Sequence, residues 1–241
     1  MNNAPGIRLA GQHVMDGKPL FETDITLPPG QWTCLLGPSG IGKSTVLRLI
    51  LGLETGGSFS GEIAASDGVP VQERVSYMAQ SDLLMPWLSV TDNVVIGARL
   101  RGETPDMARA ERLLDRVGLN AHRTKTPRAL SGGMRQRAAL ARTLMEDRPV
   151  VLLDEPFSAL DAGTRADMQE LAAEVLQGKT VLLVTHDPAE ASRLGHQILL
   201  MSPQASTPWP VPASHPVRAL NDEEALTCQA DLMTHLRMVQ P

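Results

Sequence analysis

The chain has 241 residues, 42% of them hydrophobic, which is enough to bury the core of one large α/β domain or two small ones. The formal net charge of −5 gives no overall electrostatic reason to expect a nucleic-acid-binding protein. The two cysteines, Cys34 and Cys228, lack metal-ligand spacing and suit the reducing cytoplasm.

The first elements predicted along the chain are two half-buried strands. The segments "IRLAG" (7–11) and "DITL" (24–27) alternate apolar and polar residues, which indicates a small antiparallel β layer. The turn "PPG" (28–30) then leads into "WTCLLG" (32–37), which is apolar enough for a buried strand. We therefore expect Cys34 to be a core residue rather than a reactive thiol.

A glycine-rich loop follows that buried strand. "GPSGIGKS" (37–44) fits the phosphate-loop pattern G-x-x-x-x-G-K-[ST], and the apolar segment "TVLRLILGL" (45–53) after it predicts a buried helix. Backbone N–H groups of such a loop wrap a phosphate, Lys43 reaches the β and γ phosphates, and Ser44 ligates Mg²⁺. The alternative is a chance glycine turn, but the strand before the loop and the helix after it favour phosphate binding.

The middle of the chain predicts a helical insertion over about residues 88–147. A strand at 74–80 precedes it, and one of its helices begins at Thr104, the expected N-cap, and ends at Gly118. Further on, "LSGGMRQR" (130–137) places a serine and two glycines at a helix start, where backbone N–H groups attract anions. This would be a second anion site beside the phosphate loop.

Two short apolar runs after the insertion predict parallel strands buried on both faces. They are "PVVLLDEP" (149–156) and "TVLLVTHD" (180–187), with a helix between them. Asp154 and Glu155 emerge where α/β folds bind ligands, so one carboxylate can support Mg²⁺ and the other can accept a proton from water. His186 ends the second run in the same way, although a lone histidine is by default a surface or packing residue.

The C-terminal part predicts an irregular connector and a last helix. Prolines cluster over residues 202–216, and a helix begins near Asp222 with Asn221 and Glu224 as a capping-box pair. The apolar residues of this helix that share one face are Leu226, Ala230 and Met233.

The ordered set "GPSGIGKST", Gln80, "LSGGMRQR", "VVLLDEP", "SALD" and "THD" resembles the ATP-binding subunit of ABC transporters. The resemblance runs from the N-terminus to about Met201. It implies an α/β fold: a P-loop NTPase core with a mostly parallel sheet, an N-terminal antiparallel β layer and an inserted helical subdomain. We expect an ATPase domain over 1–201, and a connector with a C-terminal helix over 202–241.

The resemblance implies a role for each matching residue, with ATP and Mg²⁺ as cofactors. The catalytic residues would be the general base Glu155, the γ-phosphate switch His186, and Lys43. The ATP-binding residues would be Gly37, Pro38, Ser39, Gly40, Ile41, Gly42, Lys43, Ser44 and Thr45. The metal-binding residues would be Ser44, Gln80 and Asp154.

The same resemblance makes the second anion site part of a dimer. Two subunits of the family sandwich two ATP molecules head to tail. The residues that would contact ATP held by the partner chain are Ser131, Gly132, Gly133 and Gln136. Ser158 and Asp161 would link the two sites across the dimer, and a positive helix end would meet the γ-phosphate only when the chains close.

The adenine contact departs from the family pattern. Members carry an aromatic residue upstream of the phosphate loop, and "LAGQHVMDGKPLF" offers only His13 and Phe21. A nucleotide-binding regulator that hydrolyses ATP poorly is therefore an alternative.

The segment "MPWLSVTDNV" (85–94) is similar to importers of the nitrate, sulfonate and taurine group, which includes carriers of thiamine precursors. Beside it, Leu83, Leu84, Met85, Pro86 and Trp87 are either ordinary core or an interface. We expect a homodimer that powers an integral-membrane permease fed by a periplasmic or extracellular solute-binding protein, without nucleic acid. The solute would be a hydroxymethylpyrimidine or, second, a sulfonate.

No apolar run approaches the roughly 20 residues of a membrane span, and the N-terminal sequence is not typical of a signal peptide. The expected location is peripheral, on the cytoplasmic face of the inner membrane. The rival class is a soluble ABC ATPase that acts on nucleic acid or ribosomes.

Overall fold

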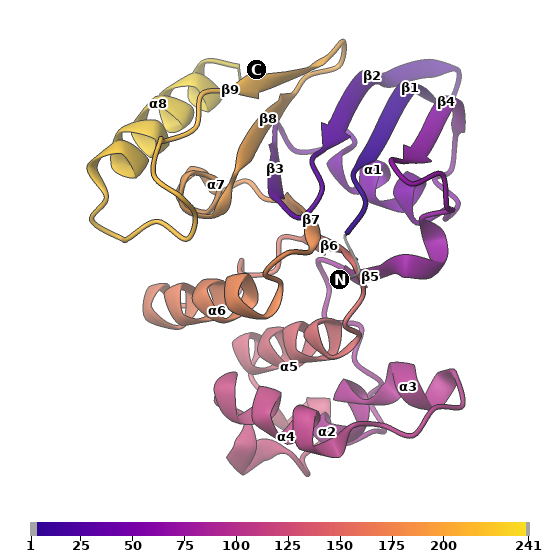
Figure 1. The fold of residues 1–241 in the computed structure, drawn as a ribbon, viewed down its shortest axis with the longest axis vertical. Helices are drawn as coiled ribbons and strands as arrows, with labels where there is room; N and C mark the ends of the chain where they lie inside the picture. The colour runs from indigo at the N-terminus through magenta and orange to yellow at the C-terminus, as the bar shows by residue number, and fades with distance from the viewer. Residues whose placement is uncertain (1–3, 240–241) are drawn as a thin grey trace. The chain divides into compact units, whose positions relative to one another are not determined.

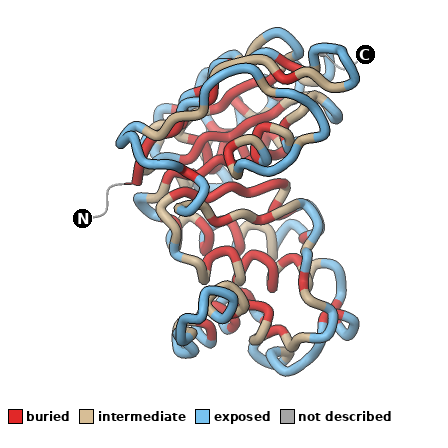
Figure 2. The backbone as a smooth tube through the Cα atoms, turned by 90° about the vertical axis from the view of Figure 1, so that its right-hand side faces the viewer, coloured by how far each residue is buried: buried red, intermediate tan, exposed pale blue. Residues whose placement is uncertain are grey.

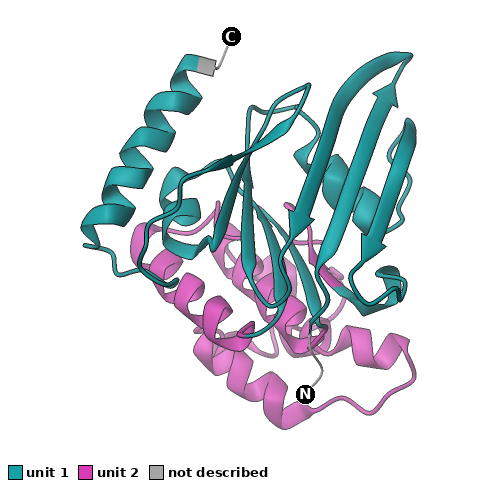
Figure 3. Ribbon diagram, turned by 45° about the horizontal axis from the view of Figure 1, so that its top comes forward, with its two compact units in different colours: residues 1–75, 149–154, 178–241 teal, residues 76–148, 155–177 magenta. Residues whose placement is uncertain are grey.

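The computed structural model describes residues 4–239, whose elements are labelled in Figure 1. The chain divides into two compact units, drawn in different colours in Figure 3. Unit 1 contains Met1–Val75, Pro149–Asp154 and Gly178–Pro241, and unit 2 contains Ser76–Arg148 and Glu155–Gln177. Unit 2 thus includes the helical insertion expected at 88–147 together with segments on both sides of it.

Unit 1 carries the expected antiparallel β layer. Strands β1 (Ile7–Met15), β2 (Lys18–Leu27) and β4 (Ser58–Ala65) form a sheet in the order β2-β1-β4. Both neighbours pair antiparallel with β1, and Leu9 lies opposite Ile25 and Ile63. The sequence did not predict β4, because its small and polar residues lack a clear alternation.

The main sheet of unit 1 is mostly parallel, as the sequence predicts. In unit 1 the strand order is β6 (Val150–Asp154), β7 (Thr180–Val184), β3 (Trp32–Leu36), β8 (Gln197–Met201) and β9 (Ser206–Trp209). Only β9 runs antiparallel to its neighbour within this set. Every residue of β3, β6 and β7 is buried, and buried backbone is red in Figure 2. These strands carry the core.

Cys34 lies inside this sheet. Its side chain is fully buried in β3, and burial raises the pKa of its thiol. A thiol that stays protonated is a poor nucleophile, so the expected core role agrees with its surroundings.

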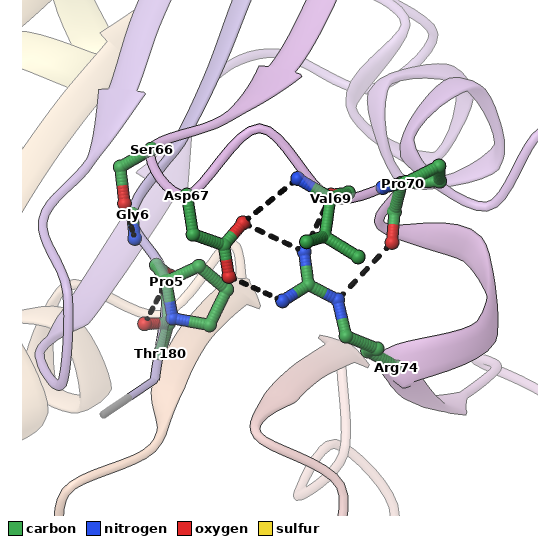
Figure 4. A network of polar contacts seen from close by, with 8 residues as sticks. All are labelled: Pro5, Gly6, Ser66, Asp67, Val69, Pro70, Arg74 and Thr180. Atoms are coloured by element: carbon green, nitrogen blue, oxygen red, sulfur yellow. Dashed lines mark hydrogen bonds and ion pairs between the residues drawn. The ribbon is translucent and has the colours of Figure 1, made fainter. Parts of the chain in front are cut away.

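The turn after β4 is held by a network of polar contacts (Figure 4). Arg74, in the short helix η1 (Gln72–Arg74), donates to both carboxylate oxygens of Asp67 and to the carbonyls of Val69 and Pro70. The guanidinium lowers the pKa of Asp67 to about 2. The network sets the path of the chain into β5 (Val75–Met78), which begins at the last residue of this part of unit 1.

The proline-rich connector is more ordered than the sequence predicts. The expectation of irregular chain over 202–216 is wrong for β9, which pairs with β8 so that Leu199 lies opposite Pro208. Proline fits an edge strand because its missing N–H can point away from the ladder.

A buried arginine fixes the rest of the connector. The guanidinium of Arg218 donates to the carbonyl oxygens of Ser192, Gly195, Pro212 and Ser214 at 2.7–3.0 Å. These four hydrogen bonds compensate for the free-energy cost of burying the charge of the guanidinium.

The last helix differs from its prediction in two respects. Helix α8 (Glu223–Val239) is capped by Asp222, whose carboxylate accepts from the Ala225 N–H at 2.9 Å, rather than by Asn221. Glu224 instead accepts from the Ala213 N–H at 2.8 Å, so the expected capping box is absent. The helix packs on α7 (Pro188–Leu194). The face that turns inward contains Ala225, Cys228 and Leu232, whereas Leu226, Ala230 and Met233 share an exposed face.

Unit 2 is helical. Its elements are α2 (Val90–Val94), α3 (Ile96–Leu100), α4 (Met107–Arg116), η2 (Asn120–His122), η3 (Pro127–Ala129), α5 (Gly132–Met145) and α6 (Ala162–Val175). Helix α4 begins after Asp106, whose side chain accepts from the Arg109 N–H, and not at the predicted cap Thr104. Gly118, with φ +67°, ends this helical stretch as predicted.

No described helix is both long and apolar enough to cross a membrane.

Candidate functional site

The phosphate loop of unit 1 ends at an uncapped helix start. Helix α1 (Lys43–Ile50) has Gly42 as its N-cap, in the left-handed region with φ 105°, and no side chain caps it. The Lys43 ammonium donates to the carbonyls of Gly37 at 2.7 Å and Pro38 at 2.8 Å. Since no side chain caps α1, its positive end can serve an anion, and the lysine is held beside the same loop.

Glycine is required at position 42 for two reasons. Its φ of 105° is unfavourable for other residues, and a Cβ there would lie 2.6 Å from Cδ1 of Phe21. The loop is thus packed against a strand of the antiparallel sheet.

Asp154 and His186 also belong to unit 1, each at the end of a buried strand. Asp154 ends β6 and is 4% exposed, whereas His186 follows β7 and is exposed. The turn after β7 is fixed, because the Thr185 hydroxyl donates to Glu190 at 2.7 Å and accepts from the Asp187 N–H. Asp187 in turn caps α7. This scaffold fixes the chain on both sides of His186.

The donors available in unit 1 fit a magnesium ion. Ser44 offers an exposed hydroxyl in the first turn of α1, and Asp154 offers a buried carboxylate. No group of three or more His, Cys, Asp or Glu side chains able to hold a metal occurs among the described residues. A Mg²⁺ ion bound to a nucleotide needs no such group of side chains, because phosphate and water oxygens complete its octahedral coordination.

Glu155 begins the second segment of unit 2 in an unusual conformation. Its φ is +48°, a region that a glutamate rarely adopts and that is typical of functional sites. The Gln80 side chain donates to the Glu155 carboxylate at 3.1 Å. The Glu155 carbonyl accepts from Gln136 at 3.0 Å and from the Ser158 hydroxyl at 3.0 Å. The structure thus brings together Gln80 and Glu155, which the sequence placed in one site, and adds Gln136, which the sequence assigned to the partner chain's nucleotide.

The "LSGG" segment starts α5 with a serine cap. Ser131 is the N-cap, its hydroxyl accepts from the Met134 N–H at 3.3 Å, and Ser131 and Gly132 are exposed. Arg135 donates to the Leu130 carbonyl at 2.9 Å and to Asp82 at 3.0 Å. The helix start is therefore exposed on unit 2, and the hydrogen bonds of Arg135 fix its position.

Gln136 links α5 to the loop after Glu155. It is 6% exposed, and its side-chain oxygen accepts from the Ala159 N–H at 2.8 Å. Asp161 ends that loop as the N-cap of α6, accepts from the Thr164 N–H, and has a lowered pKa because of this backbone bond. The contact of Gln136 with a partner's nucleotide stays a prediction. Its link within the chain was not visible in the sequence, because 23 positions separate Gln136 from Ala159.

The two candidates for adenine stacking are buried. His13 and Phe21 stack on each other with ring centroids 5.6 Å apart, and both are fully inaccessible. His13 is further bonded to Thr55 at 2.7 Å, and burial lowers its pKa. Neither ring offers an exposed platform.

Known proteins resemble this chain in sequence. A family model described as ABC transporter matches residues 20–158. An ABC transporter ATP-binding protein of Haemophilus influenzae is 45% identical over 229 residues, which cover 92% of this chain and 94% of the relative. The chain belongs to the ABC transporter family.

Further relatives are import proteins. The aliphatic sulfonates import ATP-binding protein SsuB of Escherichia coli K12 is 43% identical over 199 residues, covering 81% of this chain and 76% of that one. SsuB 1 of Rhodococcus jostii is 45% identical over 209 residues, covering 85% and 82%. The predicted resemblance to importer-type subunits is confirmed.

A solved structure supports fold and activity. The dimeric, post-hydrolysis state of the ATP-binding cassette MJ0796 bound to ADP and Pi has a TM-score of 0.73 and 26% identity, and the match covers 89% of this chain and all of that one. The predicted P-loop NTPase fold is confirmed, and the protein is an ABC-type ATPase that binds ATP.

Proposed function

We propose that this ATPase hydrolyses ATP in sites completed by a second copy of the chain, and that it drives a membrane permease importing a small organic anion. The observation that carries the catalytic part is the conformation of Glu155. Its strained backbone follows the buried Asp154, and its carboxylate is held by Gln80 at 3.1 Å. Strain of this kind persists only where the surrounding structure holds it in place, and it is concentrated at active sites.

Glu155 is the general base in this proposal. It accepts a proton from the water that attacks the γ-phosphate, while the Gln80 amide orients the carboxylate. Lys43 stabilises the charge on the β and γ phosphates, and His186 donates to the γ-phosphate. Bound at Ser44 and Asp154, Mg²⁺ would neutralise phosphate charge.

The "LSGG" helix start acts on the partner's nucleotide. Ser131 and Gly132 are exposed at the positive end of a 14-residue helix, which can stabilise a terminal phosphate of another chain. The dimeric relative bound to ADP and Pi supports this arrangement. Ser158 and Asp161 would carry the signal between the two sites.

The permease would dock on the apolar residues after Gln80. The residues of the cluster expected there differ in burial. Leu83 is 58% exposed and Trp87 is 73% exposed, whereas Leu84 is buried. Exposed residues of this size support the interface interpretation over the core interpretation. The chain would then sit on the cytoplasmic face of the inner membrane, with a solute-binding protein in the same system and no nucleic acid.

The solute class follows from relatives, because this subunit contacts no solute. The SsuB proteins, named for aliphatic sulfonate import, favour a sulfonate over the hydroxymethylpyrimidine that the sequence first suggested.

Reconstitution with a permease that co-purifies with this chain tests the proposal. We expect ATP turnover in proteoliposomes to rise when the solute-binding protein carries an alkanesulfonate, and not when hydroxymethylpyrimidine is supplied. Stimulation by hydroxymethylpyrimidine alone would overturn the solute class. Turnover stimulated by nucleic acid, without any permease, would overturn the transport function.

A further inference from the structure

Helix α8 has two stripes of apolar residues, and one of them is buried within unit 1. Ala225, Cys228 and Leu232 are buried on the inward face. The other stripe, here called the outer stripe, consists of Glu223, Leu226, Ala230, Met233 and Arg237, all exposed. Leu226 is 49% exposed and Met233 is 47% exposed. The helix lies at an edge of unit 1 (Figures 1 and 3).

The spacing of the outer stripe is that of a helix-pairing seam. Its members follow one another at intervals of three, four, three and four residues, the heptad repeat by which two helices keep a common face in contact. Ala230 stands at the centre, where a small side chain lets two backbones approach.

The charges at the two ends of the outer stripe identify the partner and its direction. Glu223 is seven positions before Ala230 and Arg237 is seven positions after it. In an antiparallel pair of identical helices crossing near Ala230, each Glu223 meets the partner's residue 237, an arginine, and Leu226 meets Met233. A parallel pair would instead place like charges together at both ends.

A membrane surface fits the outer stripe less well. Helix α8 has three acidic residues, Glu223, Glu224 and Asp231, against one arginine, a net charge of −2. Anionic lipid surfaces attract basic helices.

We propose that the outer stripe of α8 binds the same stripe of a second copy of this chain, antiparallel and centred near Ala230. The contact is separate from the ATP-dependent dimer and does not depend on the function proposed above. The stripe spans 15 residues, roughly 21 Å of helix, so the interface is small and weak and forms at high protein concentration.

Cysteine crosslinking of the full chain, without nucleotide and with chelator, tests the proposal. Ala230→Cys should form a disulfide-linked dimer on mild oxidation at high protein concentration, because residue 230 meets itself. Leu226→Cys should not, because the two residues would lie about 12 Å apart along the helix axis. The wild-type chain, whose cysteines are both buried, and Asp231→Cys, exposed but outside the stripe, are the controls.

Crosslinking of Leu226→Cys as strongly as Ala230→Cys would overturn the antiparallel direction. No crosslinking of Ala230→Cys above Asp231→Cys would overturn the interface itself. Binding of the wild-type chain to anionic vesicles that Leu226→Asp abolishes, without crosslinking, would assign the stripe to a membrane and overturn the proposal.

Charge reversal gives a second readout in the Ala230→Cys chain. Glu223→Arg alone and Arg237→Glu alone should each lower the crosslinking rate about fivefold, since every dimer contains the pair twice. The double reversal should restore the rate to within about twofold, because the charges complement each other again. Equal rates in all four chains would overturn the role of these charges in the contact.

Discussion

The chain has two glycine-rich helix starts, and they are built differently. At α1 the cap is Gly42, no side chain caps the helix, and the Lys43 ammonium lies on the loop's carbonyls. At α5 the cap is Ser131, whose hydroxyl accepts from the Met134 N–H, and the nearby Arg135 is bonded to Asp82. The first start combines an open helix end with a cation, and we propose that it is a complete phosphate site. At the second start, Ser131 already caps the helix and Arg135 is paired with Asp82, so we propose that this start supplements a phosphate held by the partner chain.

Lys43→Ala should have the largest effect, because it removes the cation from the complete site. We expect ATP binding to be lost in equilibrium dialysis and turnover to fall roughly 10³-fold. Lys18→Ala removes an exposed lysine of the same unit and is the matched control. Unchanged ATP affinity in Lys43→Ala would contradict the distinction between the two starts.

Glu155→Gln should lower turnover by about 10²- to 10³-fold while ATP remains bound, because the amide cannot accept the water's proton. Size-exclusion chromatography with ATP should show a stable dimer. Glu111→Gln, an exposed site in the same unit, should behave as wild type. Turnover within twofold of wild type would exclude Glu155 as the base.

Ser131→Arg separates binding from hydrolysis. The bulky cation should block closure on the partner's nucleotide and lower turnover on the order of 10²-fold. ATP affinity of the isolated chain should change by no more than about twofold, since α1 is intact. Thr124→Arg adds the same charge at an exposed position of unit 2. Loss of monomer affinity in Ser131→Arg would mean that α5 serves its own chain's nucleotide.

Ser131→Ala should have the smallest effect. Losing the N-cap lowers the free energy of unfolding by about 1 kcal/mol and leaves the helix end in place. Chemical denaturation should report that loss, and turnover should fall only a few-fold. A loss of turnover as large as that of Ser131→Arg would show that the hydroxyl, rather than the helix end, contacts phosphate.

The phosphate loop and the parallel strands could be predicted because each is encoded within about ten consecutive residues. The contact of Gln80 with Glu155 could not, because it joins positions 75 apart. Periodicity also could not show which face of α8 is buried, since that helix has two apolar stripes and a single sequence does not say which one has a partner in the fold. Strand β9 was missed because Pro208 and the prolines that follow the strand indicate a loop, until the edge position of β9 explains Pro208.

The most direct test of a site completed by two chains is a disulfide between chains. Ser39 of the phosphate loop and Ser131 are both exposed. Two variants of the Glu155→Gln chain, one with Ser39→Cys and one with Ser131→Cys, are mixed and oxidised mildly with and without ATP. The account predicts a crosslinked heterodimer that forms with ATP and not without it. Absence of an ATP-dependent crosslink between the two chains would contradict it.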